Sequence, residues 1–393
     1  MRKLLIKLFD IFFYLAITVF LVGLLIFPKP VSAVVIDTLA VCGNVILPSL
    51  FPFFVLSSMI ITSGFAAKIG PVFSGFMKHV FGLPGCSGIA FFLGILSGYP
   101  VGANTAISLY QSGQCTKNEA ERLLAFCNNT GPAFILGTVG AGIWKDVRVG
   151  ILLYTCQTIA SVITGVIFRF YHSKQKSGAP FHQKRKPPLR SRSDIFVTAV
   201  KSSAENVFYI CAFIMFFAVV IELLTQLKFI PFISHVFASL LSFTPYGNEI
   251  SSNLVKGFFE VTTGVRLAGK GAAVIPIRLA VTGAILSWAG LSVHCQVLSF
   301  LSGSGLSATP YILGKFAQSL IGAAITYAAA IFYPIRIPVI GSGSMPIRNL
   351  SGMDLKSTLL SSLSIFCACL IFLGLSLVIT FLKSTGKRNK RHV

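Results

Sequence analysis

Charged residues are scarce in this chain of 393 residues. Only 11% of the residues are charged and 54% are hydrophobic, and the mean hydropathy is +0.81. A soluble domain usually carries about 25% charged residues, so this composition excludes an ordinary soluble protein. Long apolar stretches need helices to satisfy their backbone in lipid, so we predict an all-α polytopic membrane protein.

Acidic residues are the scarcer charged class, with 11 Asp and Glu against 33 Lys and Arg and a formal net charge of +22. The basic residues cluster at residues 2–7, 174–192 and 383–391, and no basic face interleaved with aromatics is visible. Such clusters beside apolar segments mark cytoplasmic loops and tails. We therefore expect cytoplasmic N- and C-termini, a lipid bilayer around the chain and no nucleic-acid partner.

Several kinds of site have no sequence signature here. The nine cysteines show no metal-ligand spacing and imply no disulfide framework. The glycine-rich stretches 302–305 and 341–344 lack the lysine and the strand–helix setting of a P-loop. Catalytic serine, histidine and acid groups cannot be assembled from these segments. We expect a protein that is not an enzyme and that holds no cofactor and no metal.

What the chain does contain is a short stretch, residues 94–104, with three glycines and a proline inside apolar sequence. The arms on either side, residues 85–96 and 103–113, are too short for the ~20 residues that a helix needs to cross ~30 Å of hydrocarbon. We predict a re-entrant hairpin whose turn is residues 97–102, which must be buried by protein or line a cavity. A buried, kinked helix is the alternative.

A second interruption, Asn-Asn-Thr-Gly-Pro at residues 128–132, divides the predicted span 117–144. Thr116 and Glu119 have capping-box spacing and are expected to start this span. Pro132 is expected to open a new half-helix, with Asn129 or Thr130 as its cap. We predict a broken transmembrane helix here.

The remaining segments are assigned by length and polarity. Residues 66–83 and 229–243 are expected along the membrane interface. Unbroken or bent spans are predicted at residues 11–27, 31–61 (interrupted around Asn44 and Pro48), 147–170, 206–227, 309–333 and 359–382. Since the run 11–27 exceeds the usual apolar core of a signal peptide, we predict that it is retained as a transmembrane helix.

The second half of the chain repeats the order of features of the first, with interruptions at residues 260–264 and 287–290. The basic loop between the halves must be cytoplasmic, so the second half starts from the opposite membrane face. This predicts eight spans and two re-entrant hairpins in inverted repeats, a transporter architecture with its substrate site near the midplane. The expected parts are an N-terminal transmembrane helix (1–30), a first gate repeat (31–171), a basic cytoplasmic loop (172–194), a second, inverted gate repeat (195–334), and a final part with a loop, the last transmembrane helix and a basic tail (335–393).

Three motifs carry a resemblance to a known family. The segments Pro-Ser-Leu-Phe-Pro-Phe-Phe (48–54), Ser-Gly-Tyr-Pro-Val-Gly-Ala (97–103) and Asn-Asn-Thr-Gly-Pro-Ala-Phe (128–134) resemble the sporulation integral membrane protein YlbJ family, also called stage V sporulation protein V. That family has two nucleoside-recognition gate domains similar to the core of concentrative nucleoside transporters. The resemblance implies transport of dipicolinic acid across the outer forespore membrane during sporulation.

Candidate site residues lie at the helix interruptions and among the charges within spans. Free N–H groups at half-helix starts suit an anion, and the carbonyls near Ser97 and Asn128 suit a cation. A dicarboxylate would favour Lys315 and Arg266 as counter-charges, with Glu260 binding a proton or cation. The candidates are Ser97, Gly98, Tyr99, Pro100, Asn104, Asn128, Asn129, Thr130, Glu260, Thr262, Thr263, Arg266, Ser287, Ser292 and Lys315. Alternatively, the neutral groups among them only satisfy one another.

The sequence thus favours a secondary transporter for a small organic anion, with a coupling cation or proton and a homo-oligomeric assembly as possible partners. A nucleoside or nucleobase carrier is a second hypothesis, in which Tyr99, Asn128 and Trp288 would contact the base. A non-transporting membrane scaffold for sporulation is the third.

Overall fold

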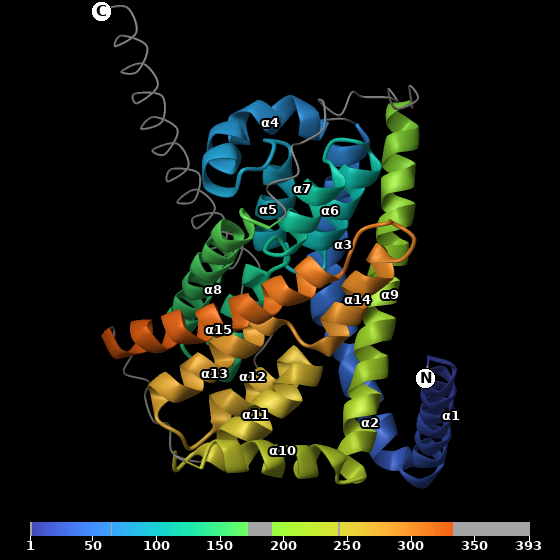
Figure 1. Ribbon diagram of the computed structural model, residues 1–393, viewed down its shortest axis with the longest axis vertical. Helices are drawn as coiled ribbons and strands as arrows, with labels where there is room; N and C mark the ends of the chain where they lie inside the picture. Colours follow the sequence, from blue (N-terminus) through green and yellow to red (C-terminus); the bar gives the residue numbers. More distant parts are fainter. Residues whose placement is uncertain (1, 64, 172–190, 243, 333–393) are drawn as a thin grey trace, which may run out of the picture.

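The computed structural model describes residues 2–63, 65–171, 191–242 and 244–332, and its regular elements in these ranges are all helices (Figure 1). The predicted span 359–382, the basic tail and most of the basic loop lie outside the described residues. The predicted all-helical fold is confirmed within the described part of the chain.

The first helix, α1 (Arg2–Ile26), meets α2 (Pro28–Val41) at a sharp bend of 94°. From α2 the chain continues through the π-helical turn η1 (Cys42–Ile46) into α3 (Leu47–Thr62). The interruption expected around Asn44 and Pro48 is therefore a widened turn. The Leu47 N–H reaches back to the Cys42 carbonyl. Pro48 follows at the start of α3, and because the helix is continuous through η1, this proline removes one backbone N–H from the helical hydrogen bonds there.

The two halves contain the same sequence of elements: a long helix, a surface helix, a hairpin, a broken helix and another long helix. After α3, the first half has α4 (Phe65–Phe76), η2 (Met77–Phe81), α5 (Ser87–Leu96), α6 (Val101–Gln111), α7 (Lys117–Leu124), η3 (Ala133–Ile143) and α8 (Val147–Phe168). The second half has α9 (Arg192–Gln226), α10 (Phe229–Leu240), α11 (Gly247–Phe259), α12 (Val261–Lys270), α13 (Ile275–Trp288), α14 (Leu291–Leu301) and α15 (Thr309–Phe332).

The halves are inverted with respect to each other. Figure 1 shows α4 lying across one end of the molecule and α10 lying across the opposite end. The hairpin α5–α6 occupies the half of the molecule near α4, and the hairpin α11–α12 occupies the half near α10. The predicted architecture of inverted repeats with two hairpins and two broken helices is thus confirmed.

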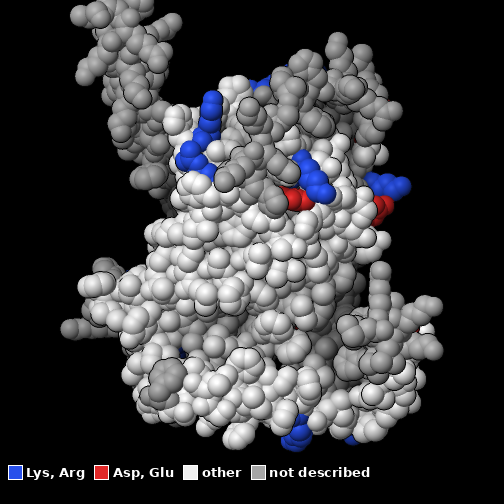
Figure 2. Space-filling view, viewed as in Figure 1, with Lys and Arg blue, Asp and Glu red and all other residues white. Residues whose placement is uncertain are grey.

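Within the described ranges, four segments are long and apolar enough to cross a membrane: Val147–Phe168, Arg192–Gln226, Ile275–Leu301 and Thr309–Phe332. The bent pair formed by Phe13–Ile26 and Pro28–Asn44 is a fifth candidate. Figure 2 shows charged side chains gathered toward the two ends of the visible face, with a broad, largely uncharged belt between them. A belt of this kind is the surface expected of a protein embedded in a bilayer.

The main core lies between the hairpins, the broken helices, α8 and α15. At one end of it Phe81 packs against Phe126 with ring centroids 4.5 Å apart, and against Phe91 at 5.4 Å. A smaller cluster joins α3 to α9 through Phe54 and Ile210. The core therefore surrounds the helix interruptions, and α3 and α9 form a separate packed pair beside it.

Candidate functional site

The turn of the first hairpin packs backbone against backbone on the interruption between α7 and η3. A Cβ atom at Gly94 or at Gly102 would overlap the carbonyl oxygen of Cys127. Gly98 has φ +91°, and a Cβ there would lie 2.6 Å from the Gly131 nitrogen. The peptide bond between Tyr99 and Pro100 is cis. These glycines let the hairpin touch the non-helical segment between α7 and η3 inside the protein, where lipid cannot reach it.

The interruption itself is held by side chains on neighbouring helices. The Asn129 amide donates to the Phe126 carbonyl at 2.9 Å and to Ser161 Oγ of α8 at 3.2 Å. Thr130 Oγ1 donates to the Leu286 carbonyl of α13 at 3.1 Å. The predicted capping role of Asn129 or Thr130 was therefore wrong: η3 follows Pro132 with no side-chain cap. Both side chains are buried and donate to acceptors other than the start of η3.

Lys315 of α15 reaches this interruption and is fully buried, with 0% exposure. Its Nζ donates to the Asn128 carbonyl at 2.9 Å and to Gln318 Oε1 at 3.0 Å. The Gln318 amide in turn donates to Asn129 Oδ1 at 2.7 Å. Among the described residues, no carboxylate lies within ion-pair distance of Lys315. The interruption between α7 and η3, from here on the first helix interruption, thus holds a buried lysine whose hydrogen-bond partners are neutral.

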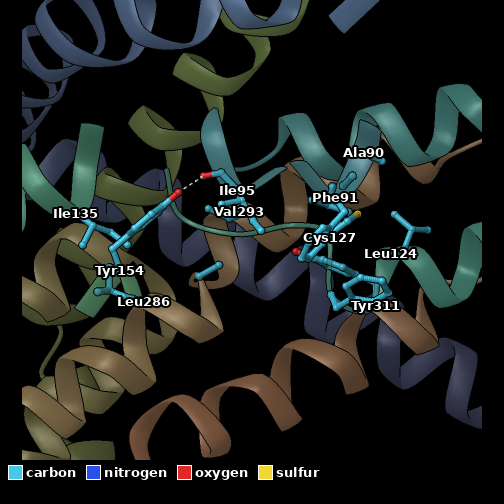
Figure 3. Close-up of a cluster of buried hydrophobic side chains, with 14 of the residues drawn as sticks. Ala90, Phe91, Ile95, Leu124, Cys127, Ile135, Tyr154, Leu286, Val293 and Tyr311 are labelled. Carbon is cyan, nitrogen blue, oxygen red and sulfur yellow. Dashed lines mark hydrogen bonds between the residues drawn. The ribbon is translucent and has the colours of Figure 1, made fainter. Parts of the chain in front are cut away.

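Tyr311 and His294 complete this cluster. The Asn128 amide donates to Tyr311 Oη at 3.4 Å, and His294 Nδ1 lies 2.9 Å from the same hydroxyl. Figure 3 shows the Tyr311 ring beside Cys127 of the interruption. The Trp288 and His294 rings pack edge to face, with their centroids 4.3 Å apart.

Several buried polar atoms of the cluster have no hydrogen-bond partner in the part of the chain that the structure describes. They are Ser97 Oγ, Tyr99 Oη, Asn128 Oδ1, Ser287 Oγ and His294 Nε2. Buried polar atoms are normally paired, so each of these is available to a bound molecule or a water. Most belong to the hairpin turn and the helix interruptions.

The second hairpin and the second broken helix repeat the arrangement. Glu260 is the single residue between α11 and α12, and its carboxylate oxygens accept the backbone N–H groups of Thr262 at 2.8 Å and Thr263 at 2.7 Å. Gly290, with φ +83°, lies against the turn: a Cβ there would be 3.2 Å from Glu260 Cα. Glu260 therefore acts as the N-cap of α12.

The first interruption meets the second broken helix in one buried region, since Thr130 donates to the Leu286 carbonyl near the end of α13. Ser319 Oγ of α15 donates to the Ala284 carbonyl of α13 at 2.9 Å, which holds α15 against the same helix. Ser292 is buried at the start of α14, and Asn104 is half-buried on α6. Arg266 is exposed on α12 and is not part of the enclosed cluster around Lys315.

The candidates proposed from the sequence omitted Tyr311 and Gln318. Both lie on the same face of α15 as Lys315, four residues before it and three residues after it. That spacing was a usable signal, because polar residues aligned with a lysine inside an apolar span indicate a buried polar face.

Comparison with known proteins agrees with this geometry. Residues 44–174 match the Gate family, described as nucleoside recognition. The chain is 29% identical over 301 residues to the sporulation integral membrane protein YlbJ of Bacillus subtilis (strain 168), which covers 72% of this chain and 74% of that protein.

Among solved structures, the chain is similar to CNTnw, a concentrative nucleoside transporter, in an outward-facing state. The TM-score is 0.53 at 13% sequence identity, over 83% of this chain and 86% of CNTnw. At this identity the likeness concerns the fold alone. The resemblance to the YlbJ family is confirmed, and the chain is a multi-pass integral membrane protein with the fold of a concentrative nucleoside transporter.

Proposed function

We propose that this protein is a secondary transporter for a small organic anion. Following its resemblance to the YlbJ family, we propose that the anion is dipicolinic acid and that it crosses the outer forespore membrane during sporulation. Alternating access around the two helix interruptions would carry it.

The observation that carries this proposal is the buried Lys315 ammonium. An unpaired charge at this depth costs several kcal/mol unless an opposite charge or water compensates it. Of its three N–H groups, two have acceptors among the described residues. An anionic substrate beside the first interruption would supply the missing negative charge.

The surroundings of Lys315 suit an aromatic dicarboxylate. Tyr99 Oη and His294 Nε2 are buried without partners in the described part of the chain, and they offer hydrogen bonds to carboxylate or ring atoms. The starts of α6 and η3 present free backbone N–H groups that favour negative charge. The ring of Trp288 lies next to His294 and offers an aromatic contact.

The test is uptake of dipicolinic acid into proteoliposomes that contain the purified full chain. Lys315→Met removes the charge at nearly constant volume and is expected to lower uptake at least about tenfold, equivalent to ~1.4 kcal/mol of lost binding. Lys201→Met changes an exposed lysine of α9 and is the matched control. Arg266→Gln should have a smaller effect, because Arg266 lies outside the cluster. Intact uptake by Lys315→Met would contradict the proposal.

A nucleoside or nucleobase carrier is the second candidate, favoured by the fold shared with CNTnw and by the unpaired amide oxygen of Asn128. The same proteoliposomes distinguish the two, because a carrier of neutral nucleosides would take up uridine or adenosine and would tolerate Lys315→Met. A protein that acts only as a sporulation scaffold would transport neither.

A further inference from the structure

Carbonyl groups exposed where a membrane helix is interrupted are the usual ligands of a coupling cation in transporters. In this chain the carbonyls of the first interruption were expected to take that role, with Asn128 among them. The structure places the Lys315 ammonium 2.9 Å from the Asn128 carbonyl. A side chain from α15 therefore already holds the ligand that a free cation would need.

Neighbouring carbonyls are engaged as well. The Phe126 carbonyl accepts from both Ser161 Oγ, at 2.8 Å, and the Asn129 amide. The Cys127 carbonyl is packed against Gly94 and Gly102 of the hairpin. Little carbonyl surface of this interruption is left for a metal ion.

The second ligand of the ammonium is also held in place. The Gln318 amide donates to Asn129 Oδ1, which turns Gln318 Oε1 toward Lys315 at 3.0 Å. Asn129 is itself tied to Ser161 of α8. A chain of hydrogen bonds from α8 through the interruption to α15 thus preorganises a binding site for one positive charge. This site, formed by the Asn128 carbonyl and Gln318 Oε1, is called the seat below.

We infer that the Lys315 ammonium is the resident cation of the first helix interruption, so that this transporter requires no sodium ion to bind or carry its substrate. The part that concerns transport depends on the proposed function, whereas the part that concerns the seat does not. Lys315 then has two roles: it fills the place of a coupling cation and it attracts the substrate anion.

The first experiment measures dipicolinic acid uptake by wild-type proteoliposomes in sodium chloride and in N-methyl-D-glucamine chloride. The two rates are expected to agree within about twofold. A rise of tenfold or more with sodium would overturn the inference and leave the anion-transport proposal standing.

The second experiment needs no transport. The thermal unfolding of the purified full chain is measured in detergent with choline chloride, sodium chloride or methylammonium chloride. The wild type is expected to respond equally to the three salts. Lys315→Ala should have a lower Tm, which methylammonium raises by at least about 2 °C relative to choline because it refills the empty seat.

Two variants serve as controls. Lys315→Met fills the seat with an apolar chain, so methylammonium should not raise its Tm, and Lys201→Ala on the exposed face of α9 should behave as the wild type. A higher Tm of the wild type in sodium chloride than in choline chloride would contradict the inference, even if no variant folds. Equal changes of the Tm of Lys315→Ala and Lys201→Ala with methylammonium would contradict it as well. If the seat behaves as expected but no anion is taken up, the proposed function fails and the resident cation stands.

Discussion

At the scale of single residues, Glu260 illustrates how a buried charge can be satisfied without an ion. Each of its carboxylate oxygens accepts a backbone N–H, from Thr262 and from Thr263. Charge-assisted hydrogen bonds of this kind stabilise a carboxylate at a helix N-terminus. The sequence suggested that Glu260 binds a proton or a coupling cation, and the two roles predict different effects of substitution.

If Glu260 acts only as the N-cap of α12, an asparagine at this position should stabilise the helix nearly as well. We expect Glu260→Asn to keep most of the thermal stability and uptake of the wild type, whereas Glu260→Ala should lose about 1 kcal/mol of stability. Thermal unfolding in detergent and proteoliposome uptake measure the two effects. If Glu260→Asn abolishes uptake while keeping its stability, the carboxylate has a proton- or cation-binding role that a cap does not explain.

At the scale of elements, each hairpin is fitted to the broken helix of its own half by glycine contacts. Gly94 and Gly102 on the first hairpin leave no space for a Cβ beside the Cys127 carbonyl. On the second hairpin, a Cβ at Gly257 would overlap the Ile285 side chain of α13, and a Cβ at Gly264 would overlap the backbone of Gly257. Close packing of small residues is a common way for helices to associate in membranes, where the hydrophobic effect does not drive association. The glycines therefore set the distance between the hairpin and the interruption.

Gly94→Ala tests this fit. The added methyl would overlap the Cys127 carbonyl and force the hairpin away from the interruption, which should cost about 1–3 kcal/mol. We expect a lower Tm in detergent and a loss of uptake. Gly137→Ala is the matched control, because a Cβ at this η3 glycine meets nothing within 4 Å. Equal behaviour of the two variants would show that the close contact has no energetic importance.

At the scale of the whole molecule, the cluster around Lys315 is closed. Lys315 and Asn128 are both 0% exposed, so a substrate can reach them only if part of the structure moves. The hairpin α5–α6 touches the α3–α9 pair through Val101, and Ser57 Oγ of α3 lies 2.8 Å from Thr105 Oγ1 of α6. We expect the hairpin to move against the pair at this contact.

We expect that linking α3 to α6 stops transport. In the double variant Ser57→Cys, Thr105→Cys, oxidation with copper phenanthroline should form a disulfide and lower uptake at least about tenfold, the equivalent of ~1.4 kcal/mol in the barrier. A reducing agent should restore uptake. Each single variant, treated in the same way, is the control. Full cross-linking by mass spectrometry with unchanged uptake would exclude movement at this contact.

The positions of the helix interruptions could be read from the sequence because their causes are local. Glycine and proline weaken or end a helix at their own position, and the interruptions lie where these residues cluster, at 97–100, 125–132 and 289–290. The capping box of Thr116 and Glu119 is also a local pattern, and the structure confirms it. The interruption predicted at residues 260–264 is shorter in the structure, which breaks the helix at Glu260 alone and keeps Gly264 inside α12.

The partners of the site residues were decided by the tertiary structure alone. Lys315 meets the carbonyl of Asn128, 187 positions away in the chain, and Thr130 takes the Leu286 carbonyl and does not cap η3. Arg266 was paired with Lys315 on charge, yet it lies exposed on α12. Helix breaks follow from the chemistry of neighbouring residues, whereas these contacts exist only because two inverted halves pack together and bring distant segments into one buried space.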